Sequence, residues 1–154
     1  MKKVFLRTRL FLGVMAFITS GIVLAGCKDE DEDDKNSTEL KYENVVVNAA
    51  QEFPPVNSTA SGTFNGTYNK TTKLLTYSIM HNVSGATAAH FHEAPKDSSG
   101  AIVIPIAAPY TSITNRTATL TTAQESDLLR GRLYVNIHSP SFPAGEIRGQ
   151  IPAK

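Results

Sequence analysis

The chain has 154 residues, with 15 basic and 14 acidic side chains and a single cysteine. A formal net charge of +1 without a long basic run argues against nucleic-acid binding, which needs a concentrated basic surface. One cysteine excludes an internal disulfide and leaves no partner thiol for redox chemistry at sulfur.

The N-terminal quarter predicts a lipoprotein leader. It opens with four basic residues, Lys2, Lys3, Arg7 and Arg9. The apolar run over 10–25 is too short and too rich in small residues for a membrane span, but it fits a signal peptide. Leu24-Ala25-Gly26-Cys27 resembles the lipobox of bacterial lipoproteins. We therefore expect a signal peptide over 1–26 and acylation of Cys27, with palmitate among the acyl chains. An ordinary signal peptide and an N-terminal anchor helix are the alternatives.

An acidic segment follows the cysteine. Residues 28–40 contain seven acidic and two basic side chains and almost no apolar surface. Such a segment cannot bury enough surface to offset the loss of chain entropy. We predict a disordered tether over 27–40. Acid this close to the cysteine also resembles the signals that export bacterial lipoproteins to the cell surface. The expected location is thus the cell envelope, with the chain anchored by lipid in the outer membrane and facing either the periplasm or the outside.

From residue 41 to 154 the pattern predicts one all-β domain. Along 60–68, for example, small and aromatic residues alternate with polar ones. Eight short strands are expected, over 42–50, 60–68, 74–80, 88–92, 101–106, 116–120, 132–138 and 146–151. Pro, Gly, Asn and Ser between them favour a sandwich or barrel. Thr122 and Glu125 form a capping box for one helical turn, which Gly131 could end.

Two histidines form the most informative local pattern. His90 and His92 stand two apart on a predicted strand, so both imidazoles project from the same face. Their Cα atoms would be about 7 Å apart, close enough to grip one metal ion if a third ligand arrives from elsewhere. A pair of hydrogen-bonded polar residues is the alternative.

The C-terminal hairpin supplies a candidate third ligand in His138. Simple antiparallel pairing sets three polar pairs opposite one another: Tyr134 with Gln150, Asn136 with Arg148, and His138 with Glu146. A carboxylate beside His138 could orient its ring. The alternative is a cross-strand hydrogen-bond network that only fixes the hairpin. No nucleophile elbow, phosphate loop or cysteine nucleophile accompanies these residues, so no catalytic residue is assigned and enzymatic activity is not expected.

Four segments carry a family resemblance. They are QEFPPV at 51–56, AHFH at 89–92, LYVNIHS at 133–139 and FPAGEIRGQI at 142–151. In the same order they resemble the QEVPPV, AHIH and YVNVHT…YPGGEIRGQL segments of the CHRD domain, first described in the animal protein chordin. The resemblance spans nearly all of 41–152.

This resemblance implies an immunoglobulin-like β-sandwich, distantly similar to copper/zinc superoxide dismutase, and no general enzymatic activity. That enzyme places copper ligands on an H-x-H strand and a later strand, as His90, His92 and His138 could do. Between Glu93 and Ile137, however, there is no histidine. The bridging ligand and zinc-loop histidines are missing, so a two-metal site cannot be carried over.

The sequence favours one function and leaves a second as its alternative. The first is a membrane-anchored binding or scaffolding module for an extracytoplasmic protein or glycan, with Phe53, Tyr110 and Phe142 as either contact points or loop anchors. The second is a mononuclear copper or zinc protein that binds the ion through His90, His92 and His138 and that could be redox-active. Convergence of the three imidazoles favours the second, and dispersed rings would eliminate it.

Overall fold

The computed structural model describes residues 37–154. The predicted signal peptide, Cys27 and most of the predicted tether lie outside this part of the chain. Within it, no helix is long and apolar enough to cross a membrane.

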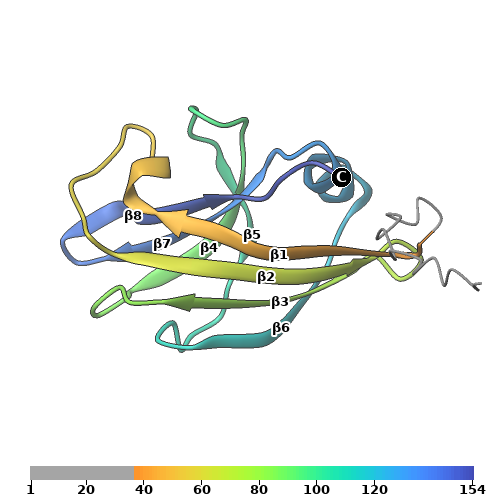
Figure 1. Cartoon of the computed structure of the whole chain (residues 1–154), viewed down its shortest axis with the longest axis horizontal. Coiled ribbons are helices and arrows are strands. Elements are labelled where there is room, and N and C mark those ends of the chain that lie inside the picture. Colours follow the sequence, from red (N-terminus) through yellow and green to blue (C-terminus); the bar gives the residue numbers. More distant parts are fainter. Residues whose placement is uncertain (1–36) are drawn as a thin grey trace, which may run out of the picture. The chain divides into compact units, whose positions relative to one another are not determined.

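All eight predicted strands are present (Figure 1). They are β1 Glu39–Asn48, β2 Ser61–Asn69, β3 Leu74–His81, β4 Ala88–Glu93, β5 Ala101–Pro105, β6 Ile113–Thr119, β7 Leu133–Ser139 and β8 Phe142–Gln150. Because β1 begins at Glu39, the first strand includes two residues that the sequence assigned to the tether.

Two short helical elements complete the domain. The 3-10 turn η1 covers Ala49–Gln51 and the helix α1 covers Thr122–Leu129. The capping box is displaced by one residue from the predicted position. The hydroxyl of Thr121 accepts a hydrogen bond from the backbone N–H of Gln124, and the side chain of Gln124 accepts one from the backbone N–H of Thr121. Thr122 instead opens the first turn of the helix.

The strands form one antiparallel sheet in the order β5-β4-β7-β8-β1-β2-β3-β6. Its two four-stranded halves meet where a single residue pair, Asn48 with Arg148, joins β1 to β8. Figure 1 shows the half containing β4, β7 and β8 crossing behind the half containing β1, β2 and β3. The predicted all-β sandwich is therefore confirmed, with the two layers joined at one edge.

Aromatic side chains fill the space between the halves. Phe91 of β4 packs edge-on against Phe64 of β2 and Tyr77 of β3, with ring centroids 6.0 and 4.9 Å apart. Phe91 and Ala89 are completely buried. Since successive strand residues face opposite sides, this packing turns His90 and His92 away from the core. The hydrophobic core thus fixes the face on which the histidines lie.

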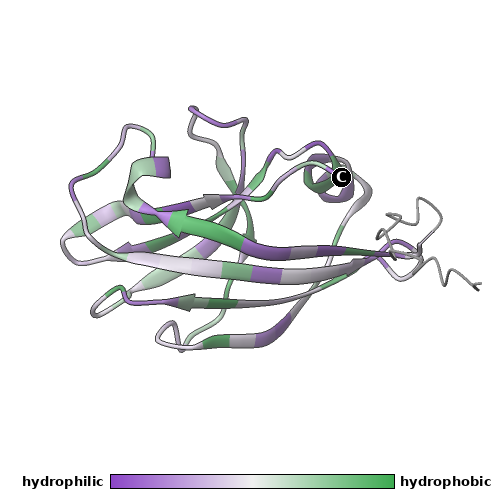
Figure 2. Ribbon diagram, viewed as in Figure 1, coloured by the Kyte–Doolittle hydropathy of each residue, from purple (hydrophilic) through white to green (hydrophobic). Residues whose placement is uncertain are grey.

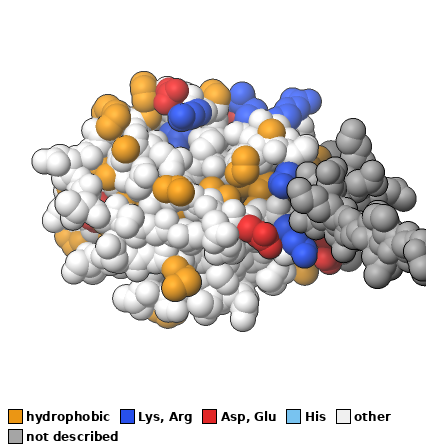
Figure 3. Space-filling model, in the orientation of Figure 1, with side chains coloured by type: hydrophobic (Ala, Val, Ile, Leu, Met, Phe, Trp, Pro, Cys, Tyr) orange, Lys and Arg blue, Asp and Glu red, His pale blue; other side chains and the backbone are white. Residues whose placement is uncertain are grey.

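The outer surface of the front half is mostly uncharged. In Figure 3, acidic and basic side chains lie singly or in small groups among uncharged ones, so this face shows no extended basic surface. The valine run of β1 is a hydrophobic stretch in Figure 2, yet Val47 is buried and Val46 is 55% exposed. Phe53 is also exposed, whereas Tyr110 packs against the core.

The aromatic packing predicts where the stability resides. Phe91→Ala should lower the free energy of unfolding by about 3 to 5 kcal/mol, because it removes a fully buried ring and leaves a cavity. Met80→Ala, at a side chain 71% exposed on β3, is the control and should change it little. Urea unfolding of both variants measures the difference, and equal losses would contradict a core between the two halves.

Candidate metal centre

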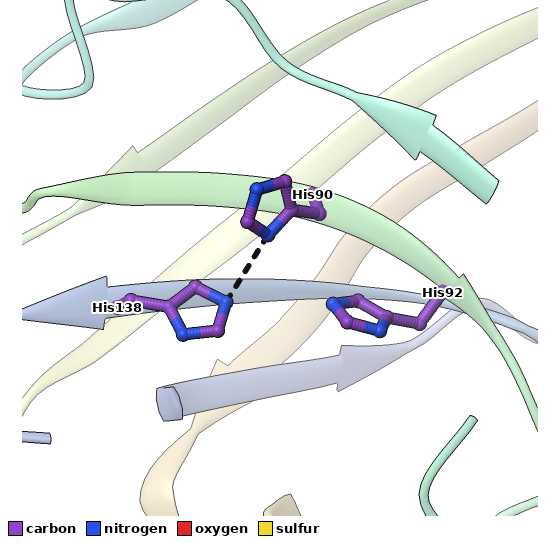
Figure 4. A group of neighbouring side chains, drawn as sticks. All are labelled: His90, His92 and His138. Carbon is purple, nitrogen blue, oxygen red and sulfur yellow. Dashed lines mark hydrogen bonds between the residues drawn. The ribbon is translucent and has the colours of Figure 1, made fainter. Parts of the chain in front are cut away.

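Two neighbouring strands supply the three histidines of the candidate centre (Figure 4). His90 and His92 lie on β4, and His138 lies on β7. In the register of this pair, Asn136 lies opposite His90 and Ala88 lies opposite His138. His90 and His138 are therefore diagonal neighbours on one face of the sheet, within reach of each other's long side chains.

The three imidazoles converge. One ring nitrogen from each lies within 4.8 Å of the others. Nδ1 of His90 is 3.2 Å from Nε2 of His138, and the ring of His92 is centred 5.7 Å from that of His90. Nitrogens bound to one tetrahedral zinc ion lie about 3.4 Å apart, as Zn–N bonds of about 2.0 to 2.1 Å require. The nitrogens of His90 and His138 are already near that separation, and the ring of His92 would have to move closer to reach it.

Backbone carbonyls orient two of the rings through hydrogen bonds at Nδ1. Nδ1 of His92 lies 3.1 Å from the carbonyl oxygen of Gly100, and Nδ1 of His138 lies 3.0 Å from that of Pro143. A carbonyl only accepts, so each Nδ1 carries the proton and each Nε2 presents its lone pair. Nε2 of His92 is buried and has no hydrogen-bond partner in the described part of the chain.

The surroundings keep these rings neutral. Burial lowers the pKa of His90, His92 and His138, and repulsion between His90 and His138 lowers that of His90 further. The carbonyls of Gly100 and Pro143 act in the opposite direction but do not reverse the shifts. A neutral imidazole is the form that binds metal ions.

The polar face of the hairpin differs in part from the predicted pairing. Tyr134 pairs with Gln150, as expected, and Asn136 pairs with Arg148. The expected pair of His138 with Glu146 does not form, because the register shifts between Ile137 and Ser139. Glu146 instead accepts a hydrogen bond of 2.8 Å from the hydroxyl of Ser58. The group that orients His138 is thus a backbone carbonyl rather than a carboxylate.

Arg148 is the centre of this polar network. It is 1% exposed, and its guanidinium carbon lies 3.5 Å from the ring centroid of Tyr134. It donates to the carbonyl oxygens of Ser98 and Pro95 at 2.7 and 3.2 Å, and to the side-chain oxygen of Gln150 at 2.6 Å. The sequence predicted the side chains of this network but not its contacts with the β4–β5 loop.

Glu52 is a member of the site that the sequence analysis did not assign. Its Oε1 accepts a hydrogen bond of 2.6 Å from the amide of Asn136, which lies opposite His90 and two residues before His138 on β7. Burial raises the pKa of Glu52 to about 7, although Arg148 acts to lower it. The signal in the sequence was the QEFPPV segment, whose glutamate is placed here against the hairpin.

A family model described as the CHRD domain matches residues 44–151. The chain belongs to the CHRD domain family. This match covers the three histidines, Glu52 and the Arg148 network, and membership indicates a non-enzymatic module. None of the curated proteins and none of the solved structures that were compared with this CHRD protein matches it.

The buried carboxyl predicts a pH effect on stability. Between pH 4.5, the ordinary pKa, and about 7, folded Glu52 binds more protons than unfolded Glu52. The free energy of unfolding should therefore fall as pH rises through this interval, by about 3 kcal/mol. Glu52→Gln keeps an oxygen that can accept from Asn136, but it cannot ionise. The free energy of unfolding of this variant should therefore not show this fall between pH 4.5 and 7.

The measurement is urea unfolding of the wild type and Glu52→Gln at pH 4.5, 6 and 8. Contributions from the histidines cancel in the difference between the two proteins. A difference that is the same at all three pH values would show that folded Glu52 titrates normally.

Proposed function

We propose that this CHRD domain is a lipid-anchored, non-enzymatic module that binds one copper or zinc ion through His90, His92 and His138. The observation that carries the proposal is the convergence of three imidazole nitrogens, from two strands, within 4.8 Å. Imidazole is a good ligand for both metals.

Hydrogen bonding alone satisfies this cluster poorly. Nδ1 of His90 and Nε2 of His138 can share one proton, but Nε2 of His92 is buried without a partner among the described residues. Buried polar atoms ordinarily have a hydrogen-bond partner. A single cation would accept all three lone pairs. Outward Nδ1–H bonds to carbonyls, as at His92 and His138, are also what metal-binding histidines ordinarily make.

The donor set indicates an open site. Structural zinc sites have four protein ligands, whereas three protein ligands leave a position for water or another molecule. A bound copper or zinc ion would supply a Lewis acid, and copper could also change oxidation state. His90 and His92 are only partly buried, so the face that carries them is accessible from solvent. This arrangement favours a module that takes up and presents the ion.

The anchor would keep the module close to the membrane. Residues 28–38 separate Cys27 from the start of β1 at Glu39. Even fully extended, this segment would span at most about 40 Å. In this proposal the domain lies near the surface of the outer membrane and meets extracytoplasmic proteins or glycans there.

The metal site can be tested by isothermal titration of the full-length chain in detergent with Cu²⁺ and Zn²⁺. We expect sub-micromolar binding at one equivalent, lost in the His90→Ala/His92→Ala double variant. His81→Ala is the matched control, because this fourth histidine lies on β3 and contacts the carbonyl of Tyr110 instead. Absence of saturable binding by the folded wild type would refute the proposal.

The anchor has a separate test. Cells that produce the wild-type chain and are fed labelled palmitate should incorporate the label into the protein, and it should sediment with the envelope. Cys27→Ala should remove both properties, because the acyl chains are the anchor. Lys28→Ala, at the next residue, should retain both. Label in the Cys27→Ala protein would show that the lipid is attached elsewhere.

A further inference from the structure

We infer that Tyr134 and Arg148 are positioning residues, which fix the orientation and tautomer of His92 through the loop Pro95–Gly100. The part of this inference that concerns metal affinity rests on the proposed function. The part that concerns the ring of His92 does not, because it can be measured in metal-free protein.

The first support is a stack of three side chains. The ring of His92 lies 5.0 Å from that of Tyr134, and the two planes are inclined by 11°. Arg148 contacts the same tyrosine ring at 3.5 Å. Since β7 lies between β4 and β8, these two groups contact Tyr134 from opposite sides. The tyrosine ring is therefore confined between a guanidinium and an imidazole.

The second support is the set of hydrogen bonds that hold the loop Pro95–Gly100 against the sheet. Arg148 binds the carbonyls of Pro95 and Ser98, and the hydroxyl of Tyr134 accepts a 3.2 Å hydrogen bond from the backbone N–H of Gly100. The carbonyl of Gly100 in turn lies 3.1 Å from Nδ1 of His92. The stack thus holds both the ring of His92 and the residue whose carbonyl orients it.

The position of Gly100 shows how closely this loop approaches β4. A Cβ atom at Gly100 would lie 1.7 Å from the carbonyl oxygen of Glu93, so only glycine fits. The loop must pass here for its carbonyl to reach His92. Because glycine itself is flexible, other groups have to define the conformation. Tyr134 and Arg148 are two of them, beside the hydroxyl of Ser99, which donates to the carbonyl oxygen of Phe53 at 2.9 Å.

A role in positioning the loop also explains why an arginine is buried at position 148. Arg148 is 1% exposed, and no carboxylate forms a salt bridge with it in the described residues, although Glu52 and Asp97 attract it from farther away. Burying a charge without a salt bridge is costly in free energy. A planar fork is needed, however, to bind two carbonyls and cover an aromatic ring together. Positioning the loop accounts for the choice of arginine.

The experiment uses the full-length chain in detergent and the variants Tyr134→Phe and Arg148→Lys. Tyr134→Phe keeps the ring stack and removes only the bond to Gly100, while Arg148→Lys keeps the charge and loses the fork. Tyr68→Phe is the matched control, because it removes another buried tyrosine hydroxyl, bonded to Glu125 at 2.7 Å. Nitrogen-15 NMR of the imidazoles, without metal, reports each tautomer.

In the wild type we expect the Nδ1–H tautomer at both His92 and His138. Each site variant should shift only His92 toward a mixture of tautomers, and Tyr68→Phe should shift neither. Titration with Zn²⁺ should show affinity that is about 10- to 100-fold weaker in the site variants, as for other losses of groups that orient metal ligands. Unchanged His92 signals in folded Tyr134→Phe and Arg148→Lys would overturn the inference.

The two proposals fail in different ways. If the wild type binds neither Zn²⁺ nor Cu²⁺ but the tautomer of His92 shifts in the variants, the metal proposal fails and the positioning role stands. If the wild type binds metal while His92 is insensitive to both substitutions, the metal site stands and the positioning role fails. Should Arg148→Lys not fold, Tyr134→Phe decides the matter alone.

Discussion

Burial of the Arg148 guanidinium on the ring of Tyr134 is the interaction on which the polar side of this domain depends. A buried cation must be satisfied by nearby acceptors, and here most of them are backbone carbonyls of the β4–β5 loop. Satisfying the charge therefore also folds the loop over the sheet. Gly100 is brought to His92 as a result, and one face of the half-sheet becomes a partly buried polar layer.

This layer can exist because the opposite face of the same strands is strongly apolar. Phe91 packs against Phe64 and Tyr77, and the residues around it are buried. A register slip of one residue in β4 would exchange Phe91 for a histidine in the core, so the core specifies the face that His90 and His92 occupy. Hydrophobic packing thus provides the alignment, and the polar contacts provide the finer geometry of the three rings.

The sequence predicted the elements of this arrangement better than their connections. Strand alternation was sufficient to place His90 and His92 on one face of their strand and His138 on the polar face of its own, since it follows from the period of a β-strand. The pairing of β4 with β7, which brings the three onto one face, was not predicted. Strand alternation did not predict the position of Glu146 correctly. The register shift near Ser139 removes the pairing that a regular hairpin would form between Glu146 and His138. The carbonyls of Gly100 and Pro143 could not be predicted either. A carbonyl belongs to every residue, so only the path of the loop shows which of them reaches a histidine. Glu52 lies far from the hairpin in sequence, and its contact with Asn136 depends on the fold.

Because the two faces are separate, metal binding would be only loosely coupled to folding. The apolar core is built from side chains other than the three histidines, so the domain does not need an ion to hold its layers together. This distinguishes it from small zinc domains, in which metal binding supplies the free energy of folding. An ion bound to the preformed site would add stability according to its concentration and affinity. It would act mainly on His90, His92 and His138, and through His92 on the loop that Arg148 holds. The ordering of that loop and the occupancy of the site would then favour each other, because both depend on the same orientation of one imidazole ring.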